Sequence, residues 1–169
     1  YMKLFIKERN DKMIEVYTDG AASNNGKKDA VGGAAWVILK DGEKVAEGMR
    51  KIAPATNNIC ELVGVVEGCL AAEAILKEDN TTDLSFKPTV VVHSDSAYII
   101  NCWKEKWYQN WERNNWKNSK KKPVANKELW QALLPFFKKQ HFIFNKVAGH
   151  AGIKWNEYVD TKAVEAKEL

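Results

Sequence analysis

The feature that most constrains the fold of this 169-residue chain is a change in how its strands are connected. Five segments have strand patterns: residues 12–18, 31–39, 43–52, 89–93 and 141–147. The second and third form a hairpin around Asp41-Gly42, which is a strong turn signal. The last two each follow a helical pattern, and strands separated in this way favour parallel pairing. We therefore expect an α/β fold with a mixed five-stranded sheet flanked by helices.

Helical patterns occupy most of the remaining chain. Residues 58–77 carry a broad apolar stripe that includes Leu62, Val66 and Leu70. Ser94 or Ser96 can cap a helix of roughly ten residues. Two further helices are predicted over 126–139 and 155–167, so that the elements follow the order βββαβα(α)αβα. No repeat or low-complexity linker interrupts the chain, which predicts a single domain over residues 1–169 with residues 1–11 as an N-terminal extension.

Four carboxylates stand out by their positions. Asp19 is at the end of the first strand, Asp95 follows the buried fourth strand, Glu61 is one turn into the long helix, and Asp160 is in the last helix. Taken singly, each has an ordinary explanation as a turn, cap or solvated helix residue. If the first and fourth strands are neighbours, however, all four side chains reach one end of the sheet. Their mutual repulsion would then require cations, and oxygen-only ligands suit Mg²⁺ or Mn²⁺.

Positive charge is concentrated in one segment. Residues 101–127 carry eight Lys or Arg against two Glu, so this segment is +6 whereas the whole chain is +4. Trp103, Trp107 and Trp111 recur there every four residues, as on one face of a helix. An apolar stripe of this kind is normally core, and Trp103 is expected to pack there, as are Trp36, Trp130 and Trp155. Aromatic rings among lysines also bind nucleic acid by stacking and counterion release.

Cysteine usage and hydropathy indicate the compartment. Cys60, Cys69 and Cys102 form no C-x-x-C pair, and we expect them to be reduced and buried. No apolar run approaches twenty residues, and the charged start of the chain does not fit a signal peptide. We therefore expect a cytoplasmic protein that does not associate with membranes. The chain begins with Tyr1 rather than Met, as expected of a trimmed chain or of a domain from a longer one.

Six short motifs together resemble the type 1 ribonucleases H, the enzymes that cut the RNA strand of RNA/DNA hybrids. They occur in that family's order and spacing and cover about residues 13–167. The motifs are Tyr17-Thr18-Asp19-Gly20, Thr56-Asn57-Asn58 with Glu61, Ser94-Asp95-Ser96, Lys121-Lys122-Pro123-Val124, Gly149-His150-Ala151-Gly152, and Asn156-Glu157 ahead of Asp160.

The resemblance implies a ribonuclease H-like fold and two-metal hydrolysis that leaves 5′-phosphate and 3′-hydroxyl ends. Asp19, Glu61, Asp95 and Asp160 match the ligands of two Mg²⁺ ions, with Mn²⁺ as a substitute. In the family's arrangement Asp19 bridges both ions. His150 matches a mobile histidine that handles protons or product release, and the small residues beside it fit a flexible loop.

The resemblance also implies which residues contact the hybrid. Residues 103–127 match the basic protrusion of cellular and bacterial enzymes, in which Trp107 and Trp111 line the groove for the DNA strand. Thr56 and Asn126 match a pocket for a DNA phosphate, and Pro54, where family members can have arginine, predicts a weaker pocket. The remaining candidate contacts are Asn24 or Asn25, Asn57, Asn58, Ser96, Lys120, Lys121 and Lys122.

Two other functions fit parts of the same pattern. One keeps the fold but changes the role, as in the ribonuclease H module of a reverse transcriptase, a resolvase or an integrase. The other is a catalytically inactive hybrid-binding protein, although all four carboxylates are present. The main prediction is a monomeric, self-sufficient endoribonuclease.

Overall fold

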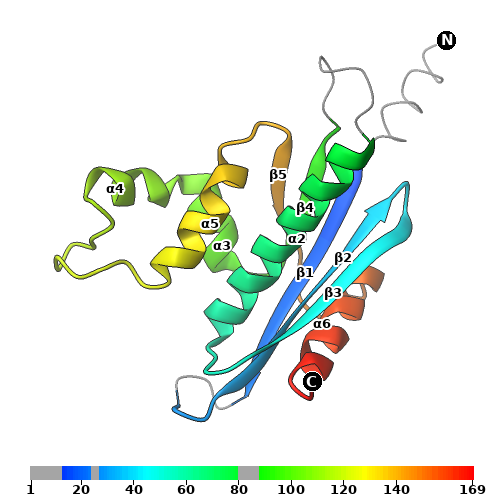
Figure 1. The fold of residues 1–169 in the computed structure, drawn as a ribbon, viewed down its shortest axis with the longest axis horizontal. Helices are drawn as coiled ribbons and strands as arrows, with labels where there is room; N and C mark the ends of the chain where they lie inside the picture. Colours follow the sequence, from blue (N-terminus) through cyan, green and yellow to red (C-terminus); the bar gives the residue numbers. More distant parts are fainter. Residues whose placement is uncertain (1–12, 24–26, 80–87) are drawn as a thin grey trace.

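The structure is a computed structural model that describes residues 13–23, 27–79 and 88–169 (Figure 1). Within these residues five strands form one sheet in the order β3-β2-β1-β4-β5. The strands β1, β2 and β3 pair antiparallel, and β1, β4 and β5 pair parallel. The predicted mixed five-stranded sheet is therefore confirmed, while the predicted N-terminal extension lies outside the described residues. The strands are β1 (Ile14–Ser23), β2 (Val31–Lys40), β3 (Glu43–Ile52), β4 (Val90–Ser94) and β5 (Phe142–Lys146).

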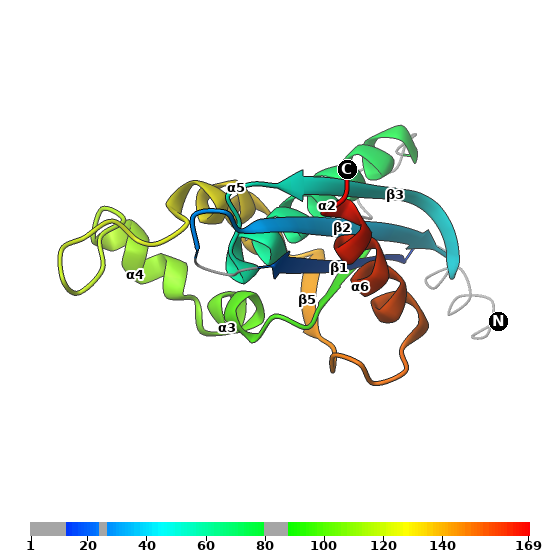
Figure 2. The same ribbon diagram turned by 90° about the horizontal axis from the view of Figure 1, so that it is seen from below.

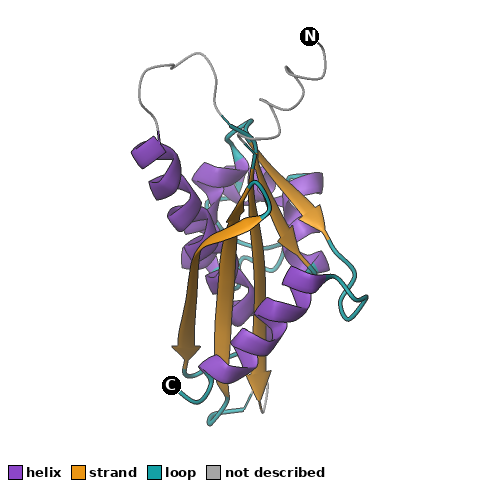
Figure 3. Cartoon of the chain, turned by 90° about the vertical axis from the view of Figure 1, so that its right-hand side faces the viewer, coloured by secondary structure: helices purple, strands orange, loops and turns teal. Residues whose placement is uncertain are grey.

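Helices cover both faces of the sheet, as Figure 3 shows. The helix α6 packs against β1, β2 and β3, whereas α2 packs against β1 and β2 on the opposite face beside α5. The larger core lies between the sheet and α2, α3 and α5, and the smaller one lies under α6. The helices are α2 (Asn57–Asp79), α3 (Ala97–Glu105), α4 (Trp107–Arg113), α5 (Lys127–Phe137) and α6 (Lys154–Ala166).

The strand β2 is buried on both faces because alternate residues contribute to different cores. Ala35 and Val37 pack under α6, while Ile38 packs in the larger core. The small residues of β2 allow helices to approach the strand closely. A Cβ added at Gly33 would lie 2.1 Å from the carbonyl oxygen of Ala163 in α6. The glycine thus allows the helix backbone to rest directly on the strand.

The first strand is longer than its sequence pattern predicted. Asp19 was expected to close it, but β1 continues to Ser23 because this part still pairs with β2, from Asp19 opposite Ala35 to Ser23 opposite Val31. The parallel pairing with β4 does end earlier, at Tyr17 opposite His93. Asp19 therefore lies where β1 runs past the end of its parallel neighbour.

The three tryptophans at four-residue spacing do not lie on one helix. Lys106 has a left-handed backbone, with φ of 57°, and it ends α3 and precedes α4. Trp103 consequently packs on Phe144, whereas Trp111 packs on Trp130. In Figures 1 and 2, α4 and the loop after it project beyond the sheet.

The long helix α2 is turned slightly from the predicted orientation. Leu62 and Val66 are buried as expected, but Leu70 is 53 % exposed. Gly68 faces β1 instead, and a Cβ there would lie 2.7 Å from Cγ1 of Val16. The glycine side of the helix, which a hydropathy pattern does not register, thus contacts the sheet.

Two other predictions about packing, for the cysteines and for the tryptophans, are confirmed by the described residues. Cys60, Cys69 and Cys102 are free and buried, and burial raises the pKa of each thiol. Trp130 is buried, and Trp36 and Trp155 pack against the two cores. None of the described helices is long and apolar enough to span a bilayer.

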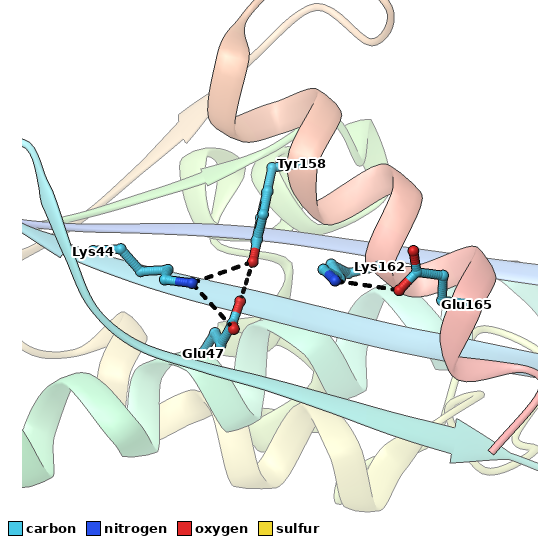
Figure 4. Close-up of polar contacts among 5 residues, drawn as sticks. All are labelled: Lys44, Glu47, Tyr158, Lys162 and Glu165. Atoms are coloured by element: carbon cyan, nitrogen blue, oxygen red, sulfur yellow. Dashed lines mark hydrogen bonds and ion pairs between the residues drawn. The ribbon is translucent and has the colours of Figure 1, made fainter.

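A polar network holds α6 to the edge strand β3 (Figure 4). The hydroxyl of Tyr158 donates to Glu47, and Lys44 donates to both of these side chains, at 3.4 Å and 3.2 Å. Lys162 pairs with Glu165 and lies over the Tyr158 ring. The network thereby holds in place the helix that also carries Asp160, two residues after Tyr158.

Candidate active site

Three of the predicted carboxylates meet at the end of the parallel strands. Asp19 follows Tyr17 by two residues and Asp95 follows His93 by two, so the register that pairs Tyr17 with His93 places both aspartates at the same level. Glu61 joins them from α2, about one turn after the start of the helix. Carboxylate oxygens of Asp19, Glu61 and Asp95 all lie within 4.8 Å of one another.

Gly20 explains how Glu61 comes so close. A Cβ at Gly20 would lie 2.4 Å from the backbone carbonyl carbon of Cys60 and from the backbone nitrogen of Glu61. The start of α2 therefore rests directly on the backbone of β1. Thr56 begins this helix by accepting a 3.1 Å hydrogen bond from the backbone nitrogen of Ile59.

The fourth carboxylate approaches from α6. Asp160 lines the same cleft and interacts with the carboxylate of Asp19. Its Oδ2 lies 3.7 Å from Nδ1 of His150, whose side chain is 83 % exposed. His150 has a left-handed backbone, with φ of 55°, in the loop between β5 and α6. The structure thus brings all five predicted catalytic residues to one cleft.

The electrostatics of the cluster are unfavourable without a cation. Burial and, to a smaller extent, the negative charge of Asp95 together raise the pKa of Asp19 to about 7. Burial also raises the pKa of Glu61, with added repulsion from Asp19 and Asp95. Without a counter-charge these acids therefore retain protons at a pH where isolated carboxylates are ionised.

The donor set fits a divalent cation. Oε2 of Glu61 is buried and has no hydrogen-bond partner in the described structure, so this acceptor is left for a ligand. The converging donors are carboxylate oxygens, which suit Mg²⁺ or Mn²⁺ rather than softer metals. Asp19, Glu61, Asp95 and Asp160 can therefore hold such ions.

The carboxylates line an open cleft of about 510 Å³. Of the predicted substrate contacts, Asn57, Asn58 and Ser96 lie in its wall. Asn57 accepts a 3.2 Å hydrogen bond from the backbone nitrogen of Ala22, and Ser96 caps α3 through Ile99. Tyr98 also lines the cleft, and sequence reasoning missed it. Its position three residues after Asp95 in a helical pattern was the available signal.

Other predicted contacts lie away from the cleft wall. Trp107 and Trp111 are half-buried and pack against the larger core. Asn126 precedes α5 with a left-handed backbone and makes no side-chain cap. Lys120, Lys121 and Lys122 are exposed in the loop after α4, while Asn24 and Asn25 lie outside the described residues.

The other two histidines have structural surroundings. His93 is buried, stacks on Tyr17 at 4.3 Å between ring centroids, and contacts Glu15 at 3.2 Å. Burial lowers its pKa. His141 packs edge-on against Phe142.

Comparison with known proteins gives a consistent result. The family model of RNase H matches residues 11–168. A protein named ribonuclease H from Clostridium botulinum is 41 % identical over 157 residues, which cover 93 % of this chain and 97 % of that one. The structure of LC9-RNase H1, described as a type 1 RNase H with the type 2 active-site motif, matches with a TM-score of 0.71 and 28 % identity, covering 92 % of this chain and 72 % of the other. LC11-RNase H1, solved in complex with an RNA/DNA hybrid, shares the fold with a TM-score of 0.64 and 22 % identity, covering 92 % of this chain and 96 % of the other.

Proposed function

This chain belongs to the ribonuclease H family, and we propose that it is a type 1 enzyme that hydrolyses the RNA strand of RNA/DNA hybrids. The proposed reaction uses two divalent metal ions, and Mg²⁺ is the proposed metal. The observation that carries this proposal is the carboxylate cluster. Asp19, Glu61 and Asp95 lie within 4.8 Å of one another in an open cleft, and Glu61 keeps a buried acceptor without a partner.

The four carboxylates are the metal ligands of the proposed reaction. Asp19 is the central member of the cluster, because it interacts with the side chains of Glu61 and Asp160 and is repelled by the charge of Asp95. Bound cations would supply charge neutralisation at the scissile phosphate and acidify water for in-line displacement. In this proposal, hydrolysis takes place at the carboxylate cluster. The products of the reaction would have 5′-phosphate and 3′-hydroxyl ends.

His150 is the proposed proton-handling residue. It is highly exposed, and its Nδ1 lies 3.7 Å from Asp160. A short loop with small residues on both sides carries it, which allows the ring to approach and leave the cleft. His150 therefore acts beside the cluster without being one of its ligands.

Recognition of the RNA strand requires contact with the 2′-hydroxyl, which distinguishes RNA from DNA. Asn57 and Asn58 are exposed amides on the cleft wall, and Ser96 adds a hydroxyl. We assign these residues to the minor-groove face of the hybrid. Asn24 or Asn25 would extend this contact.

The projecting segment 103–127 is the proposed binding surface for the DNA strand. It carries Trp107, Trp111 and a cluster of exposed lysines at residues 120–122. Thr56 and Asn126 would hold a DNA phosphate next to it. We further propose that the enzyme is a cytoplasmic monomer, in keeping with three free, buried cysteines.

Cleavage of end-labelled substrates tests the proposal. Equal amounts of an RNA/DNA hybrid, duplex RNA and duplex DNA are incubated with and without Mg²⁺. Cleavage confined to the RNA strand of the hybrid and dependent on Mg²⁺ is expected. Cleavage of duplex DNA would indicate a resolvase-like enzyme, and hybrid binding without cleavage would indicate an inactive binding protein.

A further inference from the structure

Asn156 is a buried polar residue to which the proposed reaction assigns no role. Its side chain is on α6, and the residue is 3 % exposed. Its Oδ1 is buried without a hydrogen-bond partner in the described structure. An amide in such a position costs stability, so its presence calls for an explanation.

The amide nitrogen of Asn156 reaches the loop that carries His150. Nδ2 donates to the carbonyl oxygen of Ala148 at 3.4 Å. Asn156 is also four residues before Asp160, so both side chains lie on the same side of α6, one turn apart. The same face of α6 thus carries Asp160, which belongs to the carboxylate cluster, and Asn156, which is bonded to the adjacent loop.

That loop touches the carboxylate cluster at two points. His150 pairs with Asp160 at 3.7 Å. Gly149 lies against Asp95, since a Cβ added there would come within 3.2 Å of Oδ2. Gly152 has a φ of 80°, so the loop turns back sharply before α6.

Few other contacts hold the loop in place. In the described structure, Val147 is hydrogen-bonded to Ser94 just before the loop, and α6 begins at Lys154 just after it. Between these points, two polar side-chain contacts hold the loop in the described structure. They are the hydrogen bond from Asn156 to Ala148 and the pairing of His150 with Asp160. His150 is largely in solvent, so Asn156 is the buried one of the two anchors.

We propose that Asn156 is a positioning residue that fixes loop 148–152, and with it His150, relative to Asp160. This inference rests on the proposed function only for the part played by His150. The position of the loop itself can be measured without any turnover.

A double-mutant cycle tests the effect on turnover. Asn156→Leu, which has a similar size and no polar atoms, is expected to lower kcat about tenfold, as is typical of residues that orient groups at metal sites. In a His150→Ala background the same change should lower kcat less than about twofold, because the group being positioned is absent. KM should change little in both backgrounds. An equal loss of kcat in both backgrounds would overturn the proposal.

Val159→Ala is the matched control. Val159 is fully buried in α6 under the sheet and lies away from the loop. This variant should lose stability through a cavity and keep its kcat at temperatures where it is folded. If Asn156→Leu does not fold, Asn156→Ser is tested instead. The expected losses of kcat in the wild-type and His150→Ala backgrounds are then the same as for Asn156→Leu.

The readout without turnover is the mobility of the loop amides. ¹⁵N relaxation of Gly149 and Gly152 should show lower order parameters in Asn156→Leu than in the wild type and in Val159→Ala. Unchanged order parameters would overturn the proposal. Because this measurement needs no substrate, it distinguishes a wrong role for Asn156 from a wrong proposed function.

Discussion

Asp19 is the most buried of the four carboxylates, and its surroundings define what the site needs. It is 4 % exposed, and its Oδ1 accepts a 2.9 Å hydrogen bond from the backbone nitrogen of Gly20. That bond favours the charged form, but burial and the charge of Asp95 outweigh it and raise the pKa. A cation in the cluster removes this conflict, which makes Asp19 the residue whose charge matters most.

Asp19→Asn should abolish metal-dependent cleavage. The amide keeps the size and the Oδ1 acceptor of the aspartate but removes the negative charge that a cation needs. We expect kcat to fall more than about a hundredfold, whereas hybrid affinity should stay within about threefold because the basic surface is unchanged. Single-turnover cleavage and fluorescence anisotropy measure the two effects. Near-normal turnover would show that Asp19 is not a ligand.

The same substitution should stabilise the protein in the absence of metal. The pKa of Asp19 is raised from 3.8 to about 7 in the folded state, so the folded chain binds more protons than the unfolded chain between these values. Stability therefore falls as pH rises through this window. At pH 8 with EDTA, Asp19→Asn should be more stable than wild type by up to about 4 kcal/mol, since each of the roughly three pKa units between 3.8 and 7 is worth about 1.4 kcal/mol.

Urea denaturation at pH 4 and pH 8 measures this difference. It should shrink towards zero at pH 4, where Asp19 is protonated in the folded wild type and partly protonated in the unfolded chain, whose pKa of 3.8 is close to this pH. Added Mg²⁺ should reverse the order at pH 8 because it stabilises only the wild type. A constant difference at both pH values would assign the effect to packing.

At the scale of elements, the site depends on how closely α2 lies against β1. Glu61 lies about one turn after the start of α2, and Gly20 is the point on β1 where the two backbones touch. Any side chain at Gly20 must push the helix end away. The position of one ligand is therefore set by the absence of a side chain on the neighbouring strand.

Gly20→Ala should consequently reduce activity more than stability. Its Cβ would meet backbone atoms of Cys60 and Glu61 at 2.4 Å, so α2 must move at the cluster. We expect kcat to fall at least about tenfold, given that a 1 Å misplacement at an active site can cost about a hundredfold. Steady-state kinetics at 25 °C, with thermal melts of each variant, give both quantities.

Gly68→Ala is the control for this prediction. It adds the same atom to the same interface about two turns further along α2, where the nearest atom is a side-chain methyl carbon of Val16 rather than the backbone. It should lower the melting temperature with little loss of kcat. Equal losses of kcat in both variants would mean that the helix moves as a whole.

The sequence predicted the elements well because their periodic apolar patterns reflect burial. It placed Asp19 and Asp95 at one level because each comes two residues after the last parallel pair of β1 and β4, Tyr17 opposite His93. It misjudged β1, whose last residues pair with β2 although their small side chains give no strand pattern. It also missed the break at Lys106, because a left-handed lysine between two helical patterns carries no local signal.

The whole molecule separates its charge between two regions. Acidic side chains converge in the cleft, while the segment 101–127 carries +6 and includes the part that projects from the sheet. Backbone nitrogens of Lys120 and Lys122 both donate to Oδ1 of Asn118, which holds the loop in a compact turn. In the described structure no carboxylate pairs with Lys120, Lys121 or Lys122, so their charge is available to a polyanion.

The salt dependence of hybrid binding tests this arrangement. Replacing Lys120, Lys121 and Lys122 by Ala should weaken binding and flatten the plot of log K against log salt. Each lost phosphate contact reduces the slope by roughly 0.9, so three contacts reduce it by up to about 2.7. The single-turnover rate at saturating hybrid should change less than about threefold, because the cleft is untouched.

A second triple variant controls for the loss of three positive charges. Lys44, Lys77 and Lys162 lie on β3, α2 and α6, and each pairs with a neighbouring glutamate. Replacing these three by Ala changes the net charge by the same amount but should leave the slope almost unchanged, since paired charges away from the protrusion release few counterions from the hybrid. If both triple variants flatten the slope equally, binding responds to the overall charge of the molecule, and the projecting segment has no special part in holding the DNA strand.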